Sequence, residues 1–435
     1  MKKLIVAVAL LIPPTSIHAQ KDSCLNKLSV GLEFLAHGED CRGGLPKPEK
    51  EDDVVGDYSS FLLERTRLKL NYERPGLEAK LVLRNTAVWG MSGNQALNLH
   101  ETWVKLKAPS GLFTQIGRMA LSYDDERIIG PDDWVMEALP HDALLLGYEG
   151  HGHKVHGILA YNQNAENVYS NTFYKDGAQD YKTMQTVWYH YDFPKFPFGA
   201  SLLFMNIGMQ AGSIDEDPHI EYQQLFGGYV NYHPKYLTLE GSYYRQAGHN
   251  EYNMKIDAWM ASAKATIKPS DIYNIELGYD YLSGDDYVAV VEPGSMGLPF
   301  HEVMKGFCPI YGSHHQFYGV MDYFYKSAYL QGFTPGLQNA WVGFHYTPTK
   351  KLTCDVSYHY MAVATDLRGL DRTLGHDIEL EANYDFTNDI SLSVGYTYMR
   401  GTNTMDRLKQ GNDNKNVRWA WVSLQISPNL FTTKW

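Results

Sequence analysis

Short and long connections alternate along this chain of 435 residues, and no other feature limits its fold so strongly. Segments in which apolar and polar residues alternate, the pattern of β-strands, are separated by clusters of turn-forming residues. Eight of these clusters are tight reversals: Arg74–Gly76, Ala108–Gly111, Glu149–His153, Phe193–Pro197, His233–Lys235, Lys268–Asp271, Thr347–Lys351 and Phe386–Asp389. Longer polar connections lie between them, among them residues 38–56, 122–140, 162–179, 283–337 and 401–414. Eight short turns interleaved with nine long loops predict about 18 antiparallel strands.

This alternation favours a transmembrane barrel over a soluble β-sandwich. A sandwich has no reason to place short and long connections at opposite ends, whereas a transmembrane barrel has short periplasmic turns and long extracellular loops. The candidate strands have roughly 10–15 residues, enough for tilted membrane spans. Lipid offers no hydrogen-bond partner to an open sheet edge, so the sheet must close. The predicted fold is therefore all-β, a transmembrane antiparallel β-barrel of about 18 strands.

The two faces of the candidate strands have different chemistry. In residues 62–72, Leu68 and Leu70 share one face, and Arg65, Arg67 and Lys69 share the other. In residues 377–386, the apolar face is Ile378, Leu380, Ala382, Tyr384 and Phe386, and the polar face is Asp377, Glu379, Glu381, Asn383 and Asp385. A charge that faces lipid at mid-depth costs about 2–4 kcal/mol. We therefore expect the apolar faces to contact lipid and the polar faces to line a water-filled lumen.

The N-terminal residues have the pattern of an export signal. Lys2 and Lys3 precede an apolar run from Leu4 to Ile12, and Ala19 is a plausible cleavage point. We expect a signal peptide at residues 1–19 and a single barrel domain at 20–435, with a long outer loop at about 283–337. The alternative is a buried N-terminal helix. Cys24 and Cys41 are the easiest pair to join in an exported chain, and a free role is equally compatible with Cys308 and Cys354.

Composition agrees with a barrel that spans a membrane. The net charge of −12 argues against a nucleic-acid partner. The 32 Tyr and 9 Trp suit membrane interfaces, where one end of the side chain is apolar and the other is wet. The expected partners of such a wall are outer-membrane lipid and lipopolysaccharide. We expect a monomer without a cofactor, since diffusion follows the gradient.

The charges expected in the lumen are segregated. The basic residues predicted to point inward are Arg65, Arg67, Lys69, Lys80, Arg84, Lys105, Lys107 and Arg118. The acidic residues predicted to point inward include Asp377, Glu379, Glu381, Glu276 and Asp280. Rows of like charge set ion selectivity in pores, which favours a role in conduction. The alternative is that these groups pair with one another and brace the interior.

Residues 117–134, "GRMALSYDDERIIGPDDW", lead from a strand into a long outer loop. This loop could fold inward as a constriction, with Arg127 pairing Asp124, Asp125 or Asp133. The same acids could hold Ca²⁺, which prefers oxygen ligands on flexible loops. The alternative is a loop held by salt bridges around Arg127.

The same stretch resembles the alginate-export family of outer-membrane porins. The resemblance rests on the motifs Trp89-Gly90, "LHETWVKLK", "GR" followed by "LSYDDERIIGPDDW", "HDALLLGYEG", "YGSHHQFYGVMDYFY" and "LGHDIELEANYDF". It implies an 18-stranded barrel with an electropositive conduit for an anionic polysaccharide. The motif residues it carries over are Arg118, Arg127, Asp133 and Trp134, with His314 and Asp322 in the long loop. The resemblance leaves open whether the partner solute is an anionic or a neutral saccharide. A general or differently selective porin for small solutes and a structural or adhesin barrel are the alternatives.

Two groups of residues suggest other chemistry. His151, His153 and His156 have the spacing of metal ligands, but they fall on an expected periplasmic turn without a carboxylate or thiolate shell. Ser313, His314 and His315 contain a nucleophile and bases, but adjacent residues in a loop do not form a catalytic triad. We therefore expect neither a metal site at the turn nor an enzyme.

Overall fold

The computed structural model describes residues 26–43, 58–91, 95–163, 179–212, 218–285, 303–322, 324, 334–367, 369–409 and 415–435. The expected signal peptide and Cys24, and with it the expected pairing to Cys41, lie outside these residues. The same holds for residues 286–302, 323 and 325–333 of the expected long outer loop.

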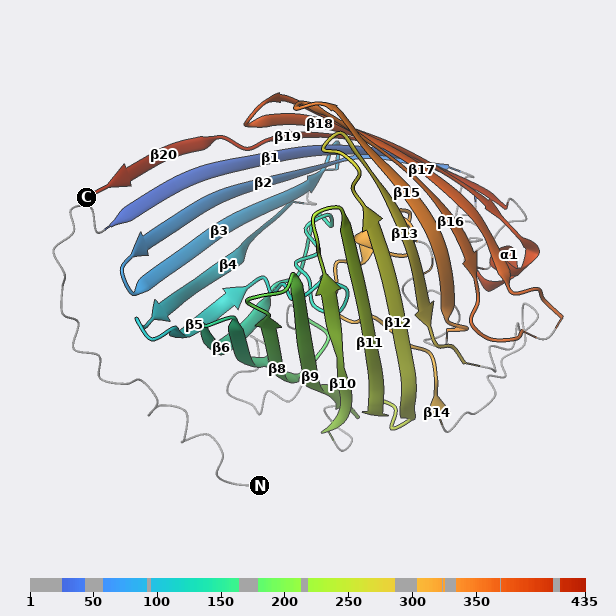
Figure 1. Cartoon of the computed structure of the whole chain (residues 1–435), viewed down its shortest axis with the longest axis horizontal. Coiled ribbons are helices and arrows are strands. Elements are labelled where there is room, and N and C mark those ends of the chain that lie inside the picture. The colour runs from blue at the N-terminus through green and yellow to red at the C-terminus, as the bar shows by residue number, and fades with distance from the viewer. Residues whose placement is uncertain are drawn as a thin grey trace.

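Eighteen strands form the closed wall of the barrel (Figure 1). They are β1 (Lys27–Arg42), β2 (Tyr58–Arg74), β3 (Leu77–Val88), β4 (Gln95–Lys107), β5 (Leu112–Met119), β6 (His141–Gly150), β7 (His153–Tyr161), β8 (Thr183–Asp192), β9 (Phe198–Ala211), β10 (His219–Tyr232), β11 (Leu237–His249), β12 (Lys255–Ile267), β13 (Tyr273–Leu282), β15 (Leu337–Thr349), β16 (Leu352–Ala362), β17 (Thr373–Thr387), β18 (Ile390–Gly401) and β19 (Asn416–Ile426). Each pairs antiparallel with its neighbours in the chain, and β1 pairs with β19 to close the ring. The predicted barrel is confirmed.

Four shorter elements complete the described structure. β20 (Asn429–Lys434) follows β19 after two residues and also pairs with β1, and β14 (Val303–Met304) lies parallel to the start of β12. The 3₁₀ turn η3 (His314–Gln316) and the helix α1 (Asn403–Leu408) are parts of loops. None of the helices in the described ranges has the length and apolar character to cross a membrane.

All eight predicted reversals lie between consecutive strands, from the turn between β2 and β3 to the turn between β17 and β18. Gly76 shows why one of them needs glycine, because its φ of +77° lies in the left-handed region. At the same end of the barrel, Asn26 and Trp435 exchange two backbone hydrogen bonds of 3.0 and 3.1 Å. This end, called the turn end below, corresponds to the expected periplasmic side, and the long loops lie at the opposite, outer end.

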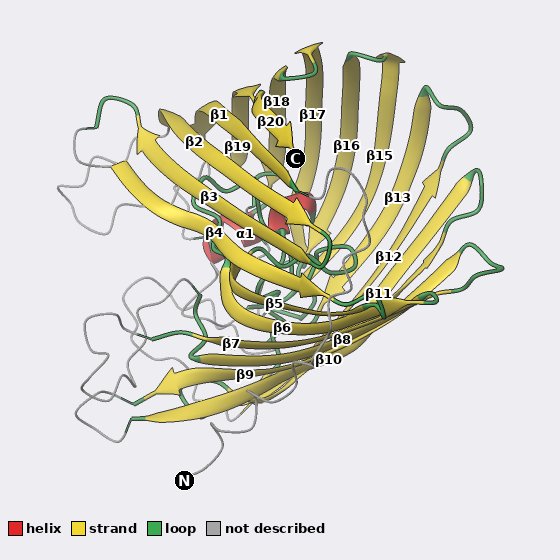
Figure 2. Cartoon of the chain, turned by 90° about the vertical axis from the view of Figure 1, so that its left-hand side faces the viewer, coloured by secondary structure: helices red, strands yellow, loops and turns green. Residues whose placement is uncertain are grey.

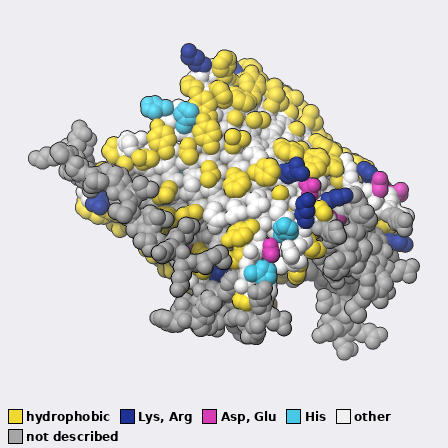
Figure 3. Space-filling view, turned by 90° about the horizontal axis from the view of Figure 1, so that it is seen from below, with side chains coloured by type: hydrophobic (Ala, Val, Ile, Leu, Met, Phe, Trp, Pro, Cys, Tyr) yellow, Lys and Arg dark blue, Asp and Glu magenta, His cyan; other side chains and the backbone are white. Residues whose placement is uncertain are grey.

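The wall has an apolar outer face, as the alternation predicted. On β17, Ile378 and Leu380 are each 45% exposed, whereas Asp377 is 1% and Glu379 is 9% exposed. Hydrophobic side chains cover much of the outer wall in Figure 3. A closed sheet with an apolar outer face satisfies its backbone hydrogen bonds internally and can span a membrane.

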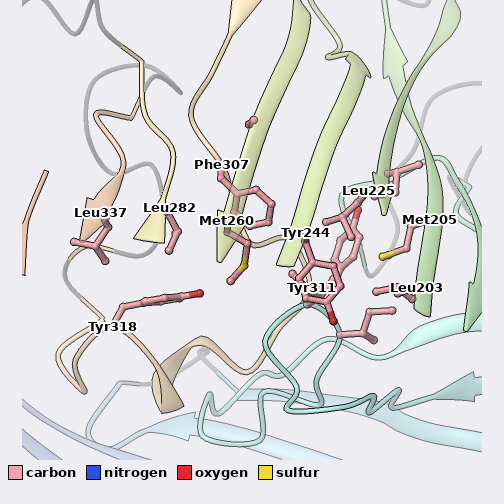
Figure 4. Packing of buried hydrophobic residues seen from close by; sticks show 14 of the residues in the cluster. Leu203, Met205, Leu225, Tyr244, Met260, Leu282, Phe307, Tyr311, Tyr318 and Leu337 are labelled. Carbon is pink, nitrogen blue, oxygen red and sulfur yellow. The ribbon is translucent and has the colours of Figure 1, made fainter. Parts of the chain in front are cut away.

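Part of the interior is filled by apolar side chains, which the alternation did not predict. Inward residues of β9–β12, such as Met205, Leu225 and Tyr244, pack with Tyr311 and Tyr318 from the connection between β13 and β15 (Figure 4). Beside these inward residues the outward ones are apolar too, as Phe204, Phe226 and Tyr243 are 46%, 41% and 51% exposed. We therefore divide the interior into an apolar cluster near β8–β13 and a charged region near β1–β4 and β17.

Candidate pore constriction

Two outer loops fold into the barrel and pair with each other. One is the β5–β6 loop, residues 120–140, and the other is the β13–β15 segment, residues 303–322; together we call them the paired loops. Tyr311 donates its backbone N–H to Ile128 and accepts from Gly130, and Ser313 donates to Glu126, with distances of 3.2, 2.8 and 2.9 Å. Figure 2, which looks along the barrel, shows loops within the ring of strands. The β5–β6 loop thus folds into the barrel, as predicted.

The contact between the paired loops is close and fixes an unusual backbone path. A Cβ atom on Gly130 would lie 2.4 Å from the Oγ of Ser313, so only glycine fits there without a shift. Asp124, Glu126 and Asp132 have φ values of 56°, 64° and 47°. Such left-handed conformations cost non-glycine residues of order 1–3 kcal/mol each and persist when surrounding contacts impose them.

Three buried arginines of β2 and β3 hold the β5–β6 loop against the wall. Arg65 Nη1 donates to the carbonyl of Asp133 at 2.8 Å, and Arg84 Nη1 donates to the carbonyl of Ala138 at 2.7 Å. Arg67 Nη2 forms an ion pair of 2.6 Å with the Asp133 carboxylate. All three guanidinium side chains are at most 4% exposed. They therefore act as anchors of the loop rather than as free charges in the lumen.

The charge of Asp133 is stabilised by this anchor. Burial raises the pKa of Asp133, but the guanidinium groups of Arg67 and Arg65 outweigh burial, so its net pKa lies below the ordinary value. Glu33 of β1, which is 3% exposed, faces the same two arginines at 3.4 and 3.0 Å. The carboxylates of Glu33 and Asp133 thus face the guanidinium groups of Arg65 and Arg67, and Glu33 also pairs with Lys69.

Trp134 joins the anchor to the β13–β15 segment. Its ring stacks on His315, with centroids 4.0 Å apart and planes 4° apart. It also meets His37 and Trp421 edge-on, at 5.0 and 5.1 Å. His315 in turn hydrogen-bonds to Asp322 at 2.9 Å. Burial raises the pKa of Asp322, and the contact with His315 opposes that shift.

Arg127 lies at the centre of the paired loops and is 5% exposed. It pairs with Asp125 at 3.2 Å and with Asp280 of β13 at 3.0 Å, and its guanidinium lies 4.0 Å from the ring centroid of Phe317. Of the three expected partners of Arg127, Asp125 is therefore found. Asp133 pairs with the wall arginines instead, and Asp124 accepts hydrogen bonds from Trp188 and Ser201.

The β13–β15 segment ends on the acidic wall. The backbone N–H of Val320 donates to Glu379 of β17 at 2.7 Å, and His359 lies 3.4 Å from the same carboxylate. Glu381, two residues closer to the turn end, is exposed. The paired loops therefore run from the arginines of β2 and β3 to the carboxylates of β17.

Lysines continue the basic wall towards the turn end. Lys69 pairs with Glu33 at 2.5 Å and Lys80 pairs with Glu101 at 2.6 Å, and their side chains are 35% and 30% exposed. The Nζ of Lys105 lies 3.8 Å from the ring centroid of Phe113. Lys107 pairs with Glu78. These groups remain accessible to a solute, although most have an acidic neighbour, as the bracing alternative predicted.

Arg118 faces the other way from its predicted direction. It shares a face of β5 with Leu112 and Ile116, which are 51% and 59% exposed, whereas the next residue, Met119, is fully buried. Its partner is Asp142 of β6, at 2.7 Å. The prediction that Arg118 points inward is wrong, because its position in the alternation of β5, and not its charge, determines the face on which it lies. Near the outer end of the strand, a paired guanidinium costs little on the lipid side.

The remaining predicted residues have structural contacts. His314 is buried in η3, and Ser313 accepts a hydrogen bond at its Oγ from the backbone N–H of Asp132. His153 contacts Tyr189, and His156 contacts Glu149. Among the described residues, no three His, Cys, Asp or Glu side chains are grouped as metal ligands. Calcium on the outer loops stays a hypothesis.

The barrel is similar to solved outer-membrane porins. Against Pseudomonas aeruginosa OccK3 (OpdO), the TM-score is 0.63 at 12% identity, over 93% of this chain and 96% of that chain. For Pseudomonas aeruginosa OccK5 (OpdH), it is 0.62 at 11% identity, over 93% and 98%. For Acinetobacter baumannii OccAB1, it is 0.61 at 11% identity, over 93% and 97%. This likeness shows the fold, and the predicted location in the outer membrane agrees with it.

No known family model matches this sequence, and no curated protein does either. The alginate-export specificity implied by the motifs therefore has no support from the comparisons and stays a prediction.

Proposed function

We propose that the chain is a monomeric outer-membrane channel for small hydrophilic solutes, selective for anions and, as the finer hypothesis, for acidic saccharides of the alginate type. One observation carries the proposal. The same basic wall that anchors the paired loops through buried arginines continues towards the turn end as the partly exposed lysines Lys69, Lys80 and Lys105. A structural or adhesin barrel has no need for a row of accessible cations inside its lumen.

The field across the lumen supports a preference for anions. Lys69, Lys80 and Lys105 lie on neighbouring strands β2, β3 and β4, and Glu381 lies on β17. Charges in a confined, low-dielectric wall raise the local concentration of oppositely charged solutes and orient polar ones. A carboxylated sugar would move along the lysines with its hydroxyl groups towards the acidic side.

The paired loops favour a small solute over a polymer. They extend across the interior from β2 and β3 to β17. The pair of Asp133 with Arg67 fixes them at the wall, the buried pair of Arg127 with Asp280 fixes them at the centre, and Val320 donates to Glu379 at β17. Passage of a folded or branched polysaccharide would require the paired loops to leave. Monomeric and short oligomeric sugar acids are therefore the solutes that the proposal predicts.

Single-channel recording in a planar bilayer tests this function. Under a salt gradient, we expect a reversal potential of the sign that anion permeation gives. Addition of glucuronate or short alginate oligomers should interrupt the current, and an uncharged disaccharide should interrupt it less. A non-selective current that neither sugar interrupts would favour a general porin for small solutes. A folded barrel that carries no current would overturn the channel itself.

A matched pair of variants locates the selectivity. Lys80→Gln combined with Lys105→Gln should lower the anion-to-cation permeability ratio, because two accessible positive charges leave the basic wall. Lys195→Gln removes an exposed charge from the turn between β8 and β9 and should leave the ratio unchanged. Equal ratios for the two variants would refute a role of the lysines in conduction.

A further inference from the structure

A pocket of about 780 Å³ lies on the outside of the barrel, away from the lumen and near the outer end. Its lining includes Tyr243 and Arg245 of β11, Asp257 and Trp259 of β12, and Tyr281 of β13. These residues lie on the outer face of their strands. On β11, Tyr243 is 51% exposed, whereas its neighbour Tyr244 is 1% exposed and points inward. The volume falls within the range of about 300–1,000 Å³ typical of ligand sites.

The lower wall of the pocket is an aromatic shelf. Trp259 stacks between Tyr281, at 4.6 Å between centroids, and Tyr243, at 6.1 Å, with planes 21° and 30° apart. Aromatic rings at this height of a barrel wall mark the boundary between acyl chains and headgroups. A ligand of this pocket therefore reaches apolar surface on one side and the headgroup layer on the other.

The upper wall carries charge. The described lining has three cationic side chains, Arg245, Lys305 and Arg372, and two acidic ones, Asp257 and Asp366. The local excess is thus positive in a chain of net charge −12.

The two arginines keep capacity for a further anion. Arg245 contacts Asp257 at 2.7 Å, and the two side chains are 49% and 48% exposed. Arg372 contacts Asp366 at 2.7 Å, with side-chain exposures of 46% and 87%. Exposed pairs of this kind contribute only about 0–1 kcal/mol. A guanidinium has five N–H donors, and a phosphate can bind two of them side by side.

We propose that this pocket binds a phosphorylated glycolipid of the outer leaflet, with the phosphates on Arg245 and Arg372 and the acyl chains against Trp259 and Tyr281. The position of the pocket selects this occupant, because a site on the lipid-facing wall draws its ligand from the surrounding leaflet. In a Gram-negative outer membrane that ligand is lipopolysaccharide. The volume accommodates a sugar headgroup rather than a phosphate alone.

Binding of lipid A to the purified, folded full-length barrel in detergent tests the site, for example by native mass spectrometry. We expect Arg245→Gln with Arg372→Gln to weaken lipid A binding about tenfold, equivalent to about 1.4 kcal/mol. Arg74→Gln, at the turn between β2 and β3, removes an exposed charge from the opposite end and should have no effect. Equal affinity of the double variant and the wild type would overturn the proposal.

The wild-type barrel provides a second test that needs no substitution. Lipid A should bind more tightly than its dephosphorylated form and more tightly than phosphatidylglycerol. Equal affinity for lipid A and its dephosphorylated form would refute the phosphate contacts. Equal affinity for lipid A and phosphatidylglycerol would refute the preference for a glycolipid. Neither result depends on whether the barrel conducts, so failure here is distinguishable from failure of the proposed channel.

Discussion

Removing the charge of Asp133 should loosen the paired loops while leaving the wall intact. In Asp133→Asn, Arg67 loses its ion pair of 2.6 Å, and the contact of Arg65 Nη2 with the carboxylate, at 3.7 Å, is weakened. The hydrogen bond from Arg65 to the backbone carbonyl of Asp133 remains. The substitution therefore isolates the contribution of one negative charge to the closed arrangement.

The size of the effect follows from the burial of the partners. A hydrogen bond to a charged group contributes about 1.5–3 kcal/mol. The arginines are nearly fully buried, but the Asp133 side chain is 54% exposed, so solvent screening reduces the figure. We expect a loss of about 1–2 kcal/mol, which raises the population of displaced loops about 5- to 30-fold.

Single-channel traces measure this population. Displaced loops should appear as more frequent transitions to a higher conductance level. Asp142→Asn is the matched control, because Asp142 pairs with Arg118 at 2.7 Å on the outside of the barrel and has no contact with the paired loops among those described. Unchanged traces in Asp133→Asn, or equal changes in both variants, would refute the view that the arginine anchor holds the loops.

Three further outcomes follow from the same contacts. Acidification should reproduce the Asp133→Asn phenotype. The pKa of Asp133 is lowered in the folded protein, so its charge stabilises the paired loops fully above its ordinary pKa of 3.8. This stabilisation is lost as the pH falls through the pKa of Asp133 in the folded protein. Recordings at neutral and at strongly acidic pH check this, and Asp133→Asn should show the smaller change. Arg127→Leu should destabilise the paired loops by about 3–5 kcal/mol, because it leaves Asp280 buried without its cation. The double variant Arg127→Leu with Asp280→Leu should recover part of that loss, measured as the free energy of unfolding in denaturant. Arg118→Gln should leave the ion selectivity unchanged in a salt gradient, since Arg118 lies outside the lumen, and a clear shift would restore the original prediction.

The sequence predicted the wall well because local rules determine it. Reversals such as Arg74–Gly76 and His233–Lys235 contain residues whose backbone preferences end a strand within a few positions. Alternation on β17 placed Asp377 and Glu379 inside and Ile378 outside, since lipid penalises the opposite phase. Such signals are readable without knowledge of any distant contact.

The interior was less predictable because its contacts join distant parts of the chain. Arg127 and Asp280 are buried together from a loop and a strand that are far apart in sequence, and no local pattern connects them. Glu33 was missed as a partner of the arginines, although its position between Leu32 and Phe34 could have identified it as an inward residue. Met205 and Leu225 broke the rule that inward residues are polar, because their neighbours in space are loop tyrosines rather than water.

The apolar cluster inside the barrel also sets an order of assembly. Tyr244 of β11, Met205 of β9 and Leu225 of β10 form a surface for Tyr311 and Tyr318 only when these strands already lie side by side. We therefore expect strands β9–β11 to pair before the β13–β15 segment packs against them. The segment would then bind inside a barrel that has already closed. A newly closed barrel would pass through a stage with a wider, unobstructed interior, and heating should release the segment before it opens the wall.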